Sequence, residues 1–215
     1  MKLDSFTRTY PDGFVLRAPA LELESSKICA VIGSNGSGKS TFARVLAGAL
    51  PADAPFSPPG DVGYLPQRGY PFRMSVRANL LLPGGGESRA EELMGALGIA
   101  HLAGRRADRL SGGELARMAL ARVLMVPRRL LILDEPTAAM DMESTALAEE
   151  LLLRTCRETG CALLLVTHSL PQARRLADEA LFFHRGALWE AGPASRVLHR
   201  PERPETAQFL AFYGG

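Results

Sequence analysis

The segment "GSNGSGKS" (33–40) constrains the fold of this 215-residue chain more than any other. It fits the pattern G-x-x-x-x-G-K-[ST] without a mismatch, directly follows the apolar run "ICAVI" (28–32), and opens a helical pattern. Between a buried strand and a helix, such glycines let a loop wrap around a chain of phosphates with its backbone N–H groups pointing inward. The segment therefore predicts a phosphate-binding loop.

Two side chains of this loop carry the expected chemistry. Lys39 should place its ammonium group on the β- and γ-phosphates of a nucleotide, and Ser40 should offer its hydroxyl to Mg²⁺. Lysine stands at only three positions, although Lys and Arg together number 25. A compact point charge fits inside such a loop, and the planar guanidinium of arginine does not. The retained lysine argues against the alternative, an ordinary turn rich in glycine and serine.

Short apolar runs alternate with helical patterns along the chain. The runs are too short for helices and are typical of strands buried on both faces; they are "ICAVI", "LLIL" (130–133), "ALLLV" (162–166) and "ALFF" (180–183). The helical patterns are "SGKSTFARVLAGAL" (37–50), "GGELARMALARVLMV" (112–126) and "MESTALAEELLLRTCRET" (142–159). This order predicts an α/β fold with a mainly parallel sheet. The alternating "LELE" (21–24) predicts a half-exposed strand.

Two regions interrupt this alternation. Residues 51–63 are rich in proline and glycine, which predicts a loop. Residues 67–109 show periodic apolar spacing broken by glycines, which predicts a small helical lobe inserted into the sheet domain. Because the length suits one domain, we interpret residues 1–215 as a single domain that carries this lobe.

Two carboxylates end the apolar run of "LLILDEP" (130–136). Residues at the carboxyl end of a parallel strand face the ligand crevice. Asp134 is therefore a candidate to hold Mg²⁺ through water. Glu135 points in another direction and is a candidate to take a proton from an attacking water. Alone, such a pair would more often be a helix cap or a turn; the phosphate-binding loop in the same chain favours the catalytic interpretation.

Two further polar residues follow apolar strands. His168 comes after the run at 162–166, and an imidazole at that edge can hydrogen-bond a γ-phosphate or orient water. Gln67 ends the strand-like "VGYLP" (62–66) and begins the lobe, where it can contact Mg²⁺ or water and couple the lobe to the nucleotide. The alternatives are a structural histidine and a solvated loop glutamine.

The segment "LSGGE" (110–114) predicts a second anion site. Ser111 as N-cap and Glu114 three residues later form the sequence of a capping box. Glycines weaken a helix, so Gly112 and Gly113 in its first turn are unexpected in a helix that is only capped. They do leave bare backbone N–H groups at the positive end of the helix, which a large anion can approach.

Composition narrows the possible partners. The formal net charge is +2, and the arginine pairs are scattered, so we expect no nucleic-acid partner. The apolar runs are far shorter than the ~20 residues that span a bilayer, and the polar start does not read as a signal peptide. We therefore expect a cytoplasmic chain unless another chain holds it at a membrane. Three cysteines without a CxxC pair predict reduced thiols.

Taken in order, these motifs resemble the nucleotide-binding subunit of an ATP-binding cassette (ABC) transporter over nearly the whole chain. Tyr10 matches the aromatic residue that stacks on adenine, Gln67 the glutamine loop, and His168 the switch histidine; "LSGGE" matches the signature and Asp141 the loop after the catalytic strand. The resemblance implies that ATP is bound by Tyr10 and by the loop residues Gly33, Ser34, Asn35, Gly36, Ser37, Gly38, Lys39, Ser40 and Thr41.

The resemblance implies a P-loop NTPase fold of the ABC type with a small antiparallel β part. Because the segment between Lys39 and Gln67 is short, we expect this antiparallel part to be smaller than is usual in the family. It implies an ATPase with Glu135, His168 and Gln67 as catalytic residues and with Mg²⁺ at Ser40, Gln67 and Asp134. It also implies two copies paired head to tail. Ser111, Gly112 and Gly113 of one copy would then donate to the γ-phosphate held by the other, which explains the second anion site.

The implied partners are transmembrane permease subunits and an extracytoplasmic solute-binding protein, with this chain at the cytoplasmic face of a bacterial membrane. Residues 167–210 resemble importer subunits for small oxyanions such as tungstate or phosphate. The first alternative is a non-transport ABC ATPase of the translation or DNA-repair type, but these carry a second cassette or a long coiled coil. The second is a P-loop kinase, which leaves "LSGGE" unexplained.

Overall fold

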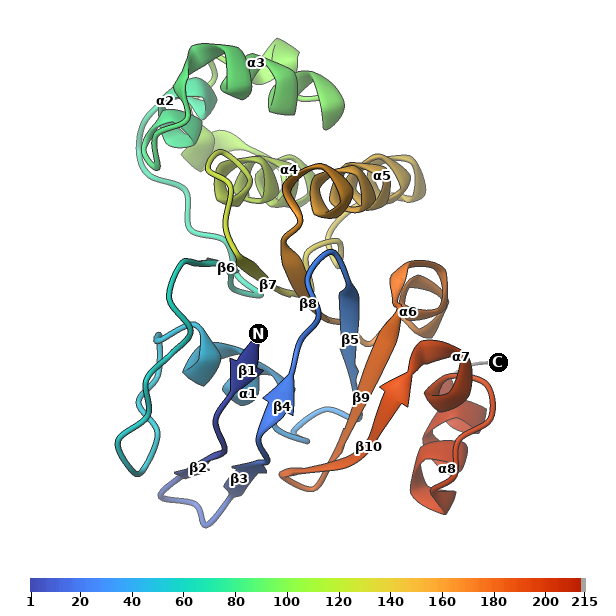
Figure 1. Ribbon diagram of the computed structural model, residues 1–215. Coiled ribbons are helices and arrows are strands. Elements are labelled where there is room, and N and C mark those ends of the chain that lie inside the picture. Colours follow the sequence, from blue (N-terminus) through green and yellow to red (C-terminus); the bar gives the residue numbers. More distant parts are fainter. Residues whose placement is uncertain (214–215) are drawn as a thin grey trace.

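The computed structural model describes residues 1–213 and is built on one eight-stranded sheet (Figure 1). The strand order is β2 (Phe6–Thr9), β3 (Val15–Ala18), β10 (Ala187–Pro193), β9 (Glu179–His184), β5 (Ile28–Ile32), β8 (Ala162–Val166), β7 (Leu130–Asp134) and β6 (Val62–Leu65). From β9 to β6 all neighbours are parallel, whereas β2–β3 and β9–β10 are antiparallel. β1 (Lys2–Leu3) and β4 (Leu21–Glu22) form a separate antiparallel pair. The expected mainly parallel fold with a small antiparallel part is confirmed.

Helices cover both faces of the parallel strands, as Figure 1 shows with α1 on one side and α4 and α5 on the other. The helices are α1 (Lys39–Leu46), α2 (Val76–Leu81), α3 (Gly86–Ala96), α4 (Gly112–Val123), α5 (Met142–Thr159), α6 (Leu170–Leu176), α7 (Ala194–Val197) and α8 (Pro204–Tyr213). Short 3-10 turns lie at Ala100–Leu102 and Ala107–Arg109. Within residues 1–213, no helix has both the length and the apolar character needed to cross a membrane.

The two faces of the sheet have separate apolar cores. Every residue of β5, β7 and β8 is buried. Along β7, Leu130 and Ile132 pack with α1, while Leu131 and Leu133 pack with the apolar side of α4 and α5. This division follows from the two-residue period of a strand. A continuous apolar run is therefore the sequence signature of a strand covered on both faces.

The ends of α5 show why its range can be read from the sequence. The Asp141 carboxylate accepts a hydrogen bond from the Ser144 N–H at 2.7 Å, which caps the start of the helix. Gly160 ends it with a φ of 71°, a left-handed conformation that glycine adopts at little cost. The helix occupies Met142–Thr159, the range of the helical pattern.

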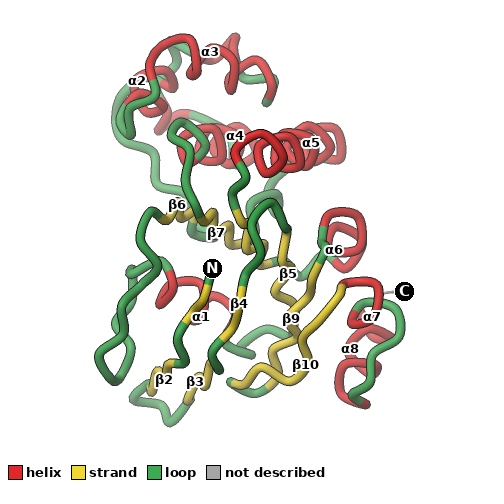
Figure 2. Tube along the Cα trace, viewed as in Figure 1, coloured by secondary structure: helices red, strands yellow, loops and turns green. Residues whose placement is uncertain are grey.

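Residues 67–109 contain α2, α3 and both 3-10 turns. Figure 2 draws α2 and α3 in red above the sheet. Their apolar residues do not form a closed core of their own. Val76, Leu80 and Leu93 belong to the same buried cluster as Met118 of α4. The segment therefore depends on α4 for its packing, and the boundaries of the lobe remain a prediction.

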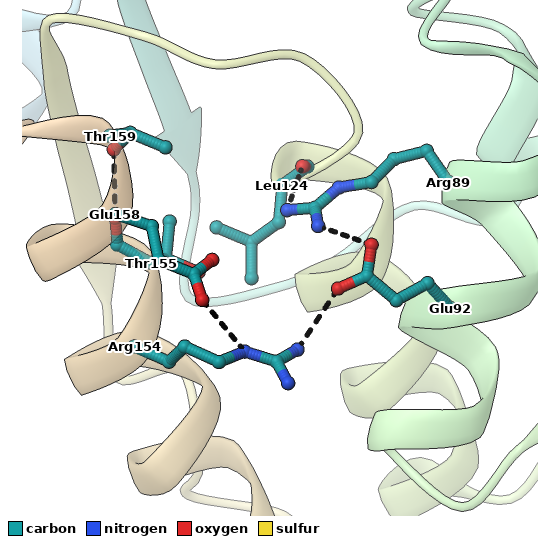
Figure 3. Close-up of polar contacts among 7 residues, drawn as sticks. All are labelled: Arg89, Glu92, Leu124, Arg154, Thr155, Glu158 and Thr159. Carbon is teal, nitrogen blue, oxygen red and sulfur yellow. Dashed lines mark hydrogen bonds and ion pairs between the residues drawn. The ribbon is translucent and has the colours of Figure 1, made fainter.

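Ion pairs also connect α3 to α5 (Figure 3). Glu92 of α3 accepts hydrogen bonds from Arg89 at 2.7 Å and from Arg154 of α5 at 3.1 Å. Arg154 also lies 4.0 Å from Glu158, and Arg89 donates to the Leu124 carbonyl after α4 at 3.4 Å. These side chains are partly exposed, so each pair contributes at most about 1 kcal/mol. Apolar burial is the larger contribution to holding the lobe.

A matched pair of leucines tests this packing. Leu80 in α2 is fully buried, whereas Leu82 just after it is 51% exposed. We expect Leu80→Ala to lower the free energy of unfolding by about 2 to 5 kcal/mol, because it leaves a cavity between α2 and α4. Leu82→Ala should cost less than about 1 kcal/mol. Urea titration of both purified variants measures the difference; equal losses would contradict the packing described.

Candidate active site

A cavity of about 620 Å³ lies at the carboxyl ends of the parallel strands. It brings together many of the side chains selected from sequence: Tyr10, Asn35, Gly36, Gly38, Lys39, Ser40, Thr41, Gln67, Glu135 and His168. Gly33, Ser34 and Ser37 belong to the same loop without lining the cavity, and Asp134 is buried beside it. The first and last of these residues in the sequence, Tyr10 and His168, are 158 positions apart, so distant segments of the chain share one site. This size is in the range of small-molecule sites.

Two lining residues, Asp12 and Phe14, were not anticipated. They lie in the turn between β2 and β3, where the Asp12 carboxylate accepts the Phe14 N–H at 3.0 Å. The signal for this turn was present, because "PDG" (11–13) is a turn sequence. What the sequence did not show is that the turn folds over the phosphate-binding loop. The Tyr10 hydroxyl reaches the Thr41 hydroxyl at 3.1 Å, which ties the turn to α1.

The phosphate-binding loop is shaped by its glycines and its lysine. A Cβ at Gly33 would overlap the Phe183 carbonyl oxygen, so only glycine fits at that position. Lys39 is 7% exposed, and its Nζ donates to the carbonyls of Gly33 at 2.8 Å and Ser34 at 2.9 Å. Burial lowers the pKa of Lys39, and the carboxylates of Glu135 and Asp134 partly oppose that shift. The lysine therefore holds the loop around itself.

Asp134 and Ser40 are candidate ligands for Mg²⁺. Asp134 is 2% exposed, and its Oδ1 has no hydrogen-bond partner within the described part of the chain. Burial raises the pKa of Asp134, while a hydrogen bond from Ser40 and the charge of Lys39 lower it. Mg²⁺ takes oxygen ligands, usually one or two from protein and the rest from phosphate and water. The free Asp134 oxygen and the Ser40 hydroxyl suit such a set, as does the amide oxygen of Gln67, which lines the same cavity as Ser40.

Glu135 and His168 form the closest polar pair in the cavity. The His168 Nδ1 lies 2.6 Å from the Glu135 Oε1, and the glutamate side chain is 9% exposed. Burial raises the pKa of Glu135, and the hydrogen bond to His168 lowers it. The Glu135 backbone is left-handed, with a φ of 53°, yet its N–H still donates to the Val166 carbonyl at 2.9 Å. This uncommon conformation carries local strain.

The predicted second anion site begins α4 as a capping box. The Glu114 N–H donates to the Ser111 hydroxyl at 3.3 Å, and the Ser111 N–H donates to the Glu114 carboxylate at 2.7 Å. A Cβ at Gly113 would lie 3.0 Å from the Ala139 carbonyl oxygen, a close approach that favours glycine. This is a second reason for a glycine that capping alone leaves unexplained. Ser111, Gly112 and Gly113 do not line the 620 Å³ cavity of their own chain.

Comparison with known proteins identifies the family. A family description, "ABC transporter", matches residues 16–138, more than half of the chain. The chain belongs to the ABC transporter family. The chain is an ATP-binding subunit with the ATPase activity that drives transport. The expectation of an ATPase is therefore confirmed.

Two relatives and one solved structure illustrate the range of the family. The tungstate uptake system ATP-binding protein TupC of Peptoclostridium acidaminophilum is 34% identical over 206 residues, or 88% of this chain and 96% of the relative. The zinc import ATP-binding protein ZnuC of Paramagnetospirillum magneticum is 35% identical over 93% of this chain and 80% of the relative. A solved ATP-binding subunit of an ABC transporter has a TM-score of 0.85 at 18% identity, over 100% of this chain and 99% of that chain, and shares the fold.

The phosphate-binding loop predicts a strict requirement for lysine. We expect Lys39→Ala to lose nucleotide binding, and Lys39→Arg not to restore it, because the guanidinium cannot occupy the enclosed position between the Gly33 and Ser34 carbonyls. Titration of each variant with a fluorescent ATP analogue measures the affinity, and Lys27→Arg, a change at a partly exposed lysine, is the control. Parental affinity in Lys39→Arg would contradict the steric reason.

Proposed function

We propose that this subunit hydrolyses MgATP to power solute import through separate transmembrane subunits. The observation that carries the proposal is the contact of 2.6 Å between Glu135 and His168 in the cavity of the phosphate-binding loop. A buried carboxylate whose pKa is raised accepts protons more readily near neutral pH. Glu135 is therefore the base for the attacking water, and His168 holds its carboxylate in place.

Each residue of the loop has a separate part in this proposal. Lys39 exchanges the Gly33 and Ser34 carbonyls for the phosphates, which removes the cost of its burial. Asp134, Ser40 and Gln67 hold Mg²⁺, which neutralises phosphate charge when bound. Tyr10 packs against adenine, and the Arg8 guanidinium lies over the Tyr10 ring, 5.5 Å from its centroid. The backbone N–H groups of the loop complete the phosphate contacts.

A second copy completes the site in this proposal. The signature residues Ser111, Gly112 and Gly113 lie outside the cavity of their own chain. The start of α4, to which they belong, is capped, and Ser111 is exposed at the beginning of this twelve-residue helix. A head-to-tail dimer brings the N–H groups of Gly112 and Gly113 and the hydroxyl of Ser111 to the γ-phosphate held by the partner, where the positive helix end favours an anion. Binding of ATP then stabilises the dimer.

The lobe offers a surface for the membrane subunits. Tyr70 is 72% and Phe72 53% exposed, and Phe72 lines a groove of about 520 Å³ with Leu82. The loop that carries them is held from within. Fully buried Asn79 exchanges hydrogen bonds with the backbone of Phe72 at 3.0 and 3.1 Å, and Arg122 donates to the Tyr70 carbonyl at 2.9 Å. Exposed aromatic side chains on a rigid loop are typical of interface hot spots.

Import follows from the relatives, whose names denote uptake of solutes as different as tungstate and zinc. An anion and a cation served by similar ATPase subunits support the view that the solute is selected by other components. We therefore include a solute-binding protein outside the membrane and place this subunit on the cytoplasmic face. No nucleic-acid partner is proposed, because net charge is +2.

Substitution of the proposed base tests the mechanism. We expect Glu135→Gln to bind MgATP but to hydrolyse it at least about a hundredfold more slowly, because the base is lost while the phosphate loop is intact. The variant should accumulate as an ATP-bound dimer in light scattering with MgATP, and ADP or omission of Mg²⁺ should leave the monomer. Hydrolysis within about threefold of the parent, or only monomer at every protein concentration, would reject Glu135 as the base.

The docking surface yields a separate test. We expect Phe72→Ala and Arg73→Ala to leave thermal stability and basal ATP hydrolysis unchanged and to abolish stimulation by the membrane subunits, because both residues are exposed. The control is Phe212→Ala, which removes an exposed aromatic ring that does not line the groove. Co-purification with the transmembrane subunits measures docking. Parental recovery of the complex with both lobe variants, or unfolding of Phe72→Ala, would show that the assignment is wrong.

A further inference from the structure

A polar cluster with a buried centre lies next to the catalytic pair without lining its cavity. It consists of Thr137, Glu149, Gln172 and Arg175, and we call it the Gln172 cluster. The Gln172 side-chain nitrogen donates to the Thr137 hydroxyl at 2.8 Å and to the Glu149 carboxylate at 3.2 Å. Arg175 donates to both oxygens of Glu149, at 2.6 and 3.0 Å. The four side chains thus form one chain of contacts across α6, α5 and the segment after β7.

The cluster joins the two segments that carry the catalytic pair. Thr137 lies two residues after Glu135, and Gln172 lies four residues after His168. β7 and β8 are neighbours in the sheet, with Asp134 opposite Val166. The segments that follow them are therefore held together twice: once by the contact between Glu135 and His168, and once by the contact between Thr137 and Gln172.

Burial makes the contact between Thr137 and Gln172 costly to break. Gln172 is 2% and Glu149 8% exposed, so neither can exchange its partner for water without cost. The two hydrogen bonds from Arg175 compensate the buried charge of Glu149, and this bidentate arrangement also fixes its orientation. Glu149 in turn directs the Gln172 amide. Since α5 and α6 are regular helices, the cluster is anchored on rigid elements.

The segment after Glu135 has few other anchors. Among the described residues, its backbone hydrogen bonds beyond Glu135 are internal turns, from Ala138 to Glu135 and from Met140 to Thr137, until Asp141 starts α5. Glu135 itself has a strained, left-handed backbone. A conformation of that kind persists only where the surroundings determine it. The Thr137 side chain provides such a restraint two residues later.

We propose that Gln172 is a positioning residue, which holds Thr137 so that Glu135 and His168 keep their hydrogen-bonded geometry. This inference rests on the proposed role of Glu135 as the base. None of the four residues lines the nucleotide cavity, so the cluster acts on turnover rather than on ATP affinity. A simple packing role would instead change stability alone.

The test compares steady-state ATP hydrolysis of the full-length protein and its variants. We expect Gln172→Ala to lower kcat about tenfold with KM for ATP within about twofold, because small displacements of a catalytic group mainly slow the chemical step. Thr137→Val, which replaces the hydroxyl with a methyl group of similar size, should lower kcat to a similar degree. The double variant should be no slower than either single variant, since both changes break the same contact. Arg174→Ala is the control on the same helix; its guanidinium contacts the Leu198 carbonyl instead.

An exchange of charge provides a rescue. Gln172→Glu sets two carboxylates against each other in a buried place, so its kcat should fall at least as far as that of Gln172→Ala. Adding Glu149→Gln restores one amide opposite one carboxylate, and kcat should return to within about threefold of the parent. Melting temperatures are recorded for all variants, and assays are run well below the lowest of them.

The outcomes separate the two proposals. A parent protein without ATPase activity, or parental activity in Glu135→Gln, rejects the proposed function. If the parent is active and Glu135→Gln is not, parental kcat in Gln172→Ala or in Thr137→Val overturns the positioning role. Additive losses in the double variant, or a rescue pair no faster than Gln172→Glu, overturn it as well. A loss confined to melting temperature assigns the cluster to helix packing only.

Discussion

The parallel register of β5, β8 and β7 is the constraint on which the site depends. Val31, Val166 and Asp134 lie opposite one another in these strands. The backbone pairing continues one residue further, because Glu135 donates to the Val166 carbonyl and Thr167 to the Val31 carbonyl. The three loops therefore leave the sheet at the same level. A slip of one residue in β7 would turn Asp134 and Glu135 to opposite faces and separate both from the phosphate-binding loop.

Desolvation is the second physical theme of the site. Lys39, Asp134 and Glu135 are all largely buried. Burial lowers the pKa of the lysine and raises the pKa of each carboxyl group, which favours the neutral form in all three cases. The lysine and the two carboxylates partly compensate one another through their opposite charges. In the proposed function, the Lys39 ammonium faces the phosphates and the Asp134 carboxylate faces Mg²⁺, so each buried charge gains an opposite charge.

Local signals account for most of what could be predicted. The range of α5 was predictable because Asp141 and Gly160 mark its ends, and β5, β7 and β8 because each is a short run buried on both faces. The turn at 11–13 could also be predicted from the sequence, but its contact with the nucleotide cavity could not. That contact depends on β3 pairing with β10, which no feature near the turn encodes.

The packing of the lobe and the contacts of the Gln172 cluster could not be predicted from the sequence either. Nothing local indicates that α2 and α3 share their apolar core with α4. Thr137, Glu149 and Gln172 come from three separate segments, and each looks like an ordinary polar residue in its own segment. Such contacts arise only when the sheet has brought the segments together.

The sequence by itself determined the chemistry of this protein: a phosphate-binding loop with its lysine, two carboxylates after a buried strand, and a capped helix start rich in glycine. These depend on residues within about ten positions of one another, where chain geometry leaves few choices. Only the tertiary structure decided which of them meet. It joined Glu135 to His168 across neighbouring strands and left Ser111 and Gly113 outside the cavity of their own chain. The physical reason is that strand order and register are set by the whole sheet and its two cores.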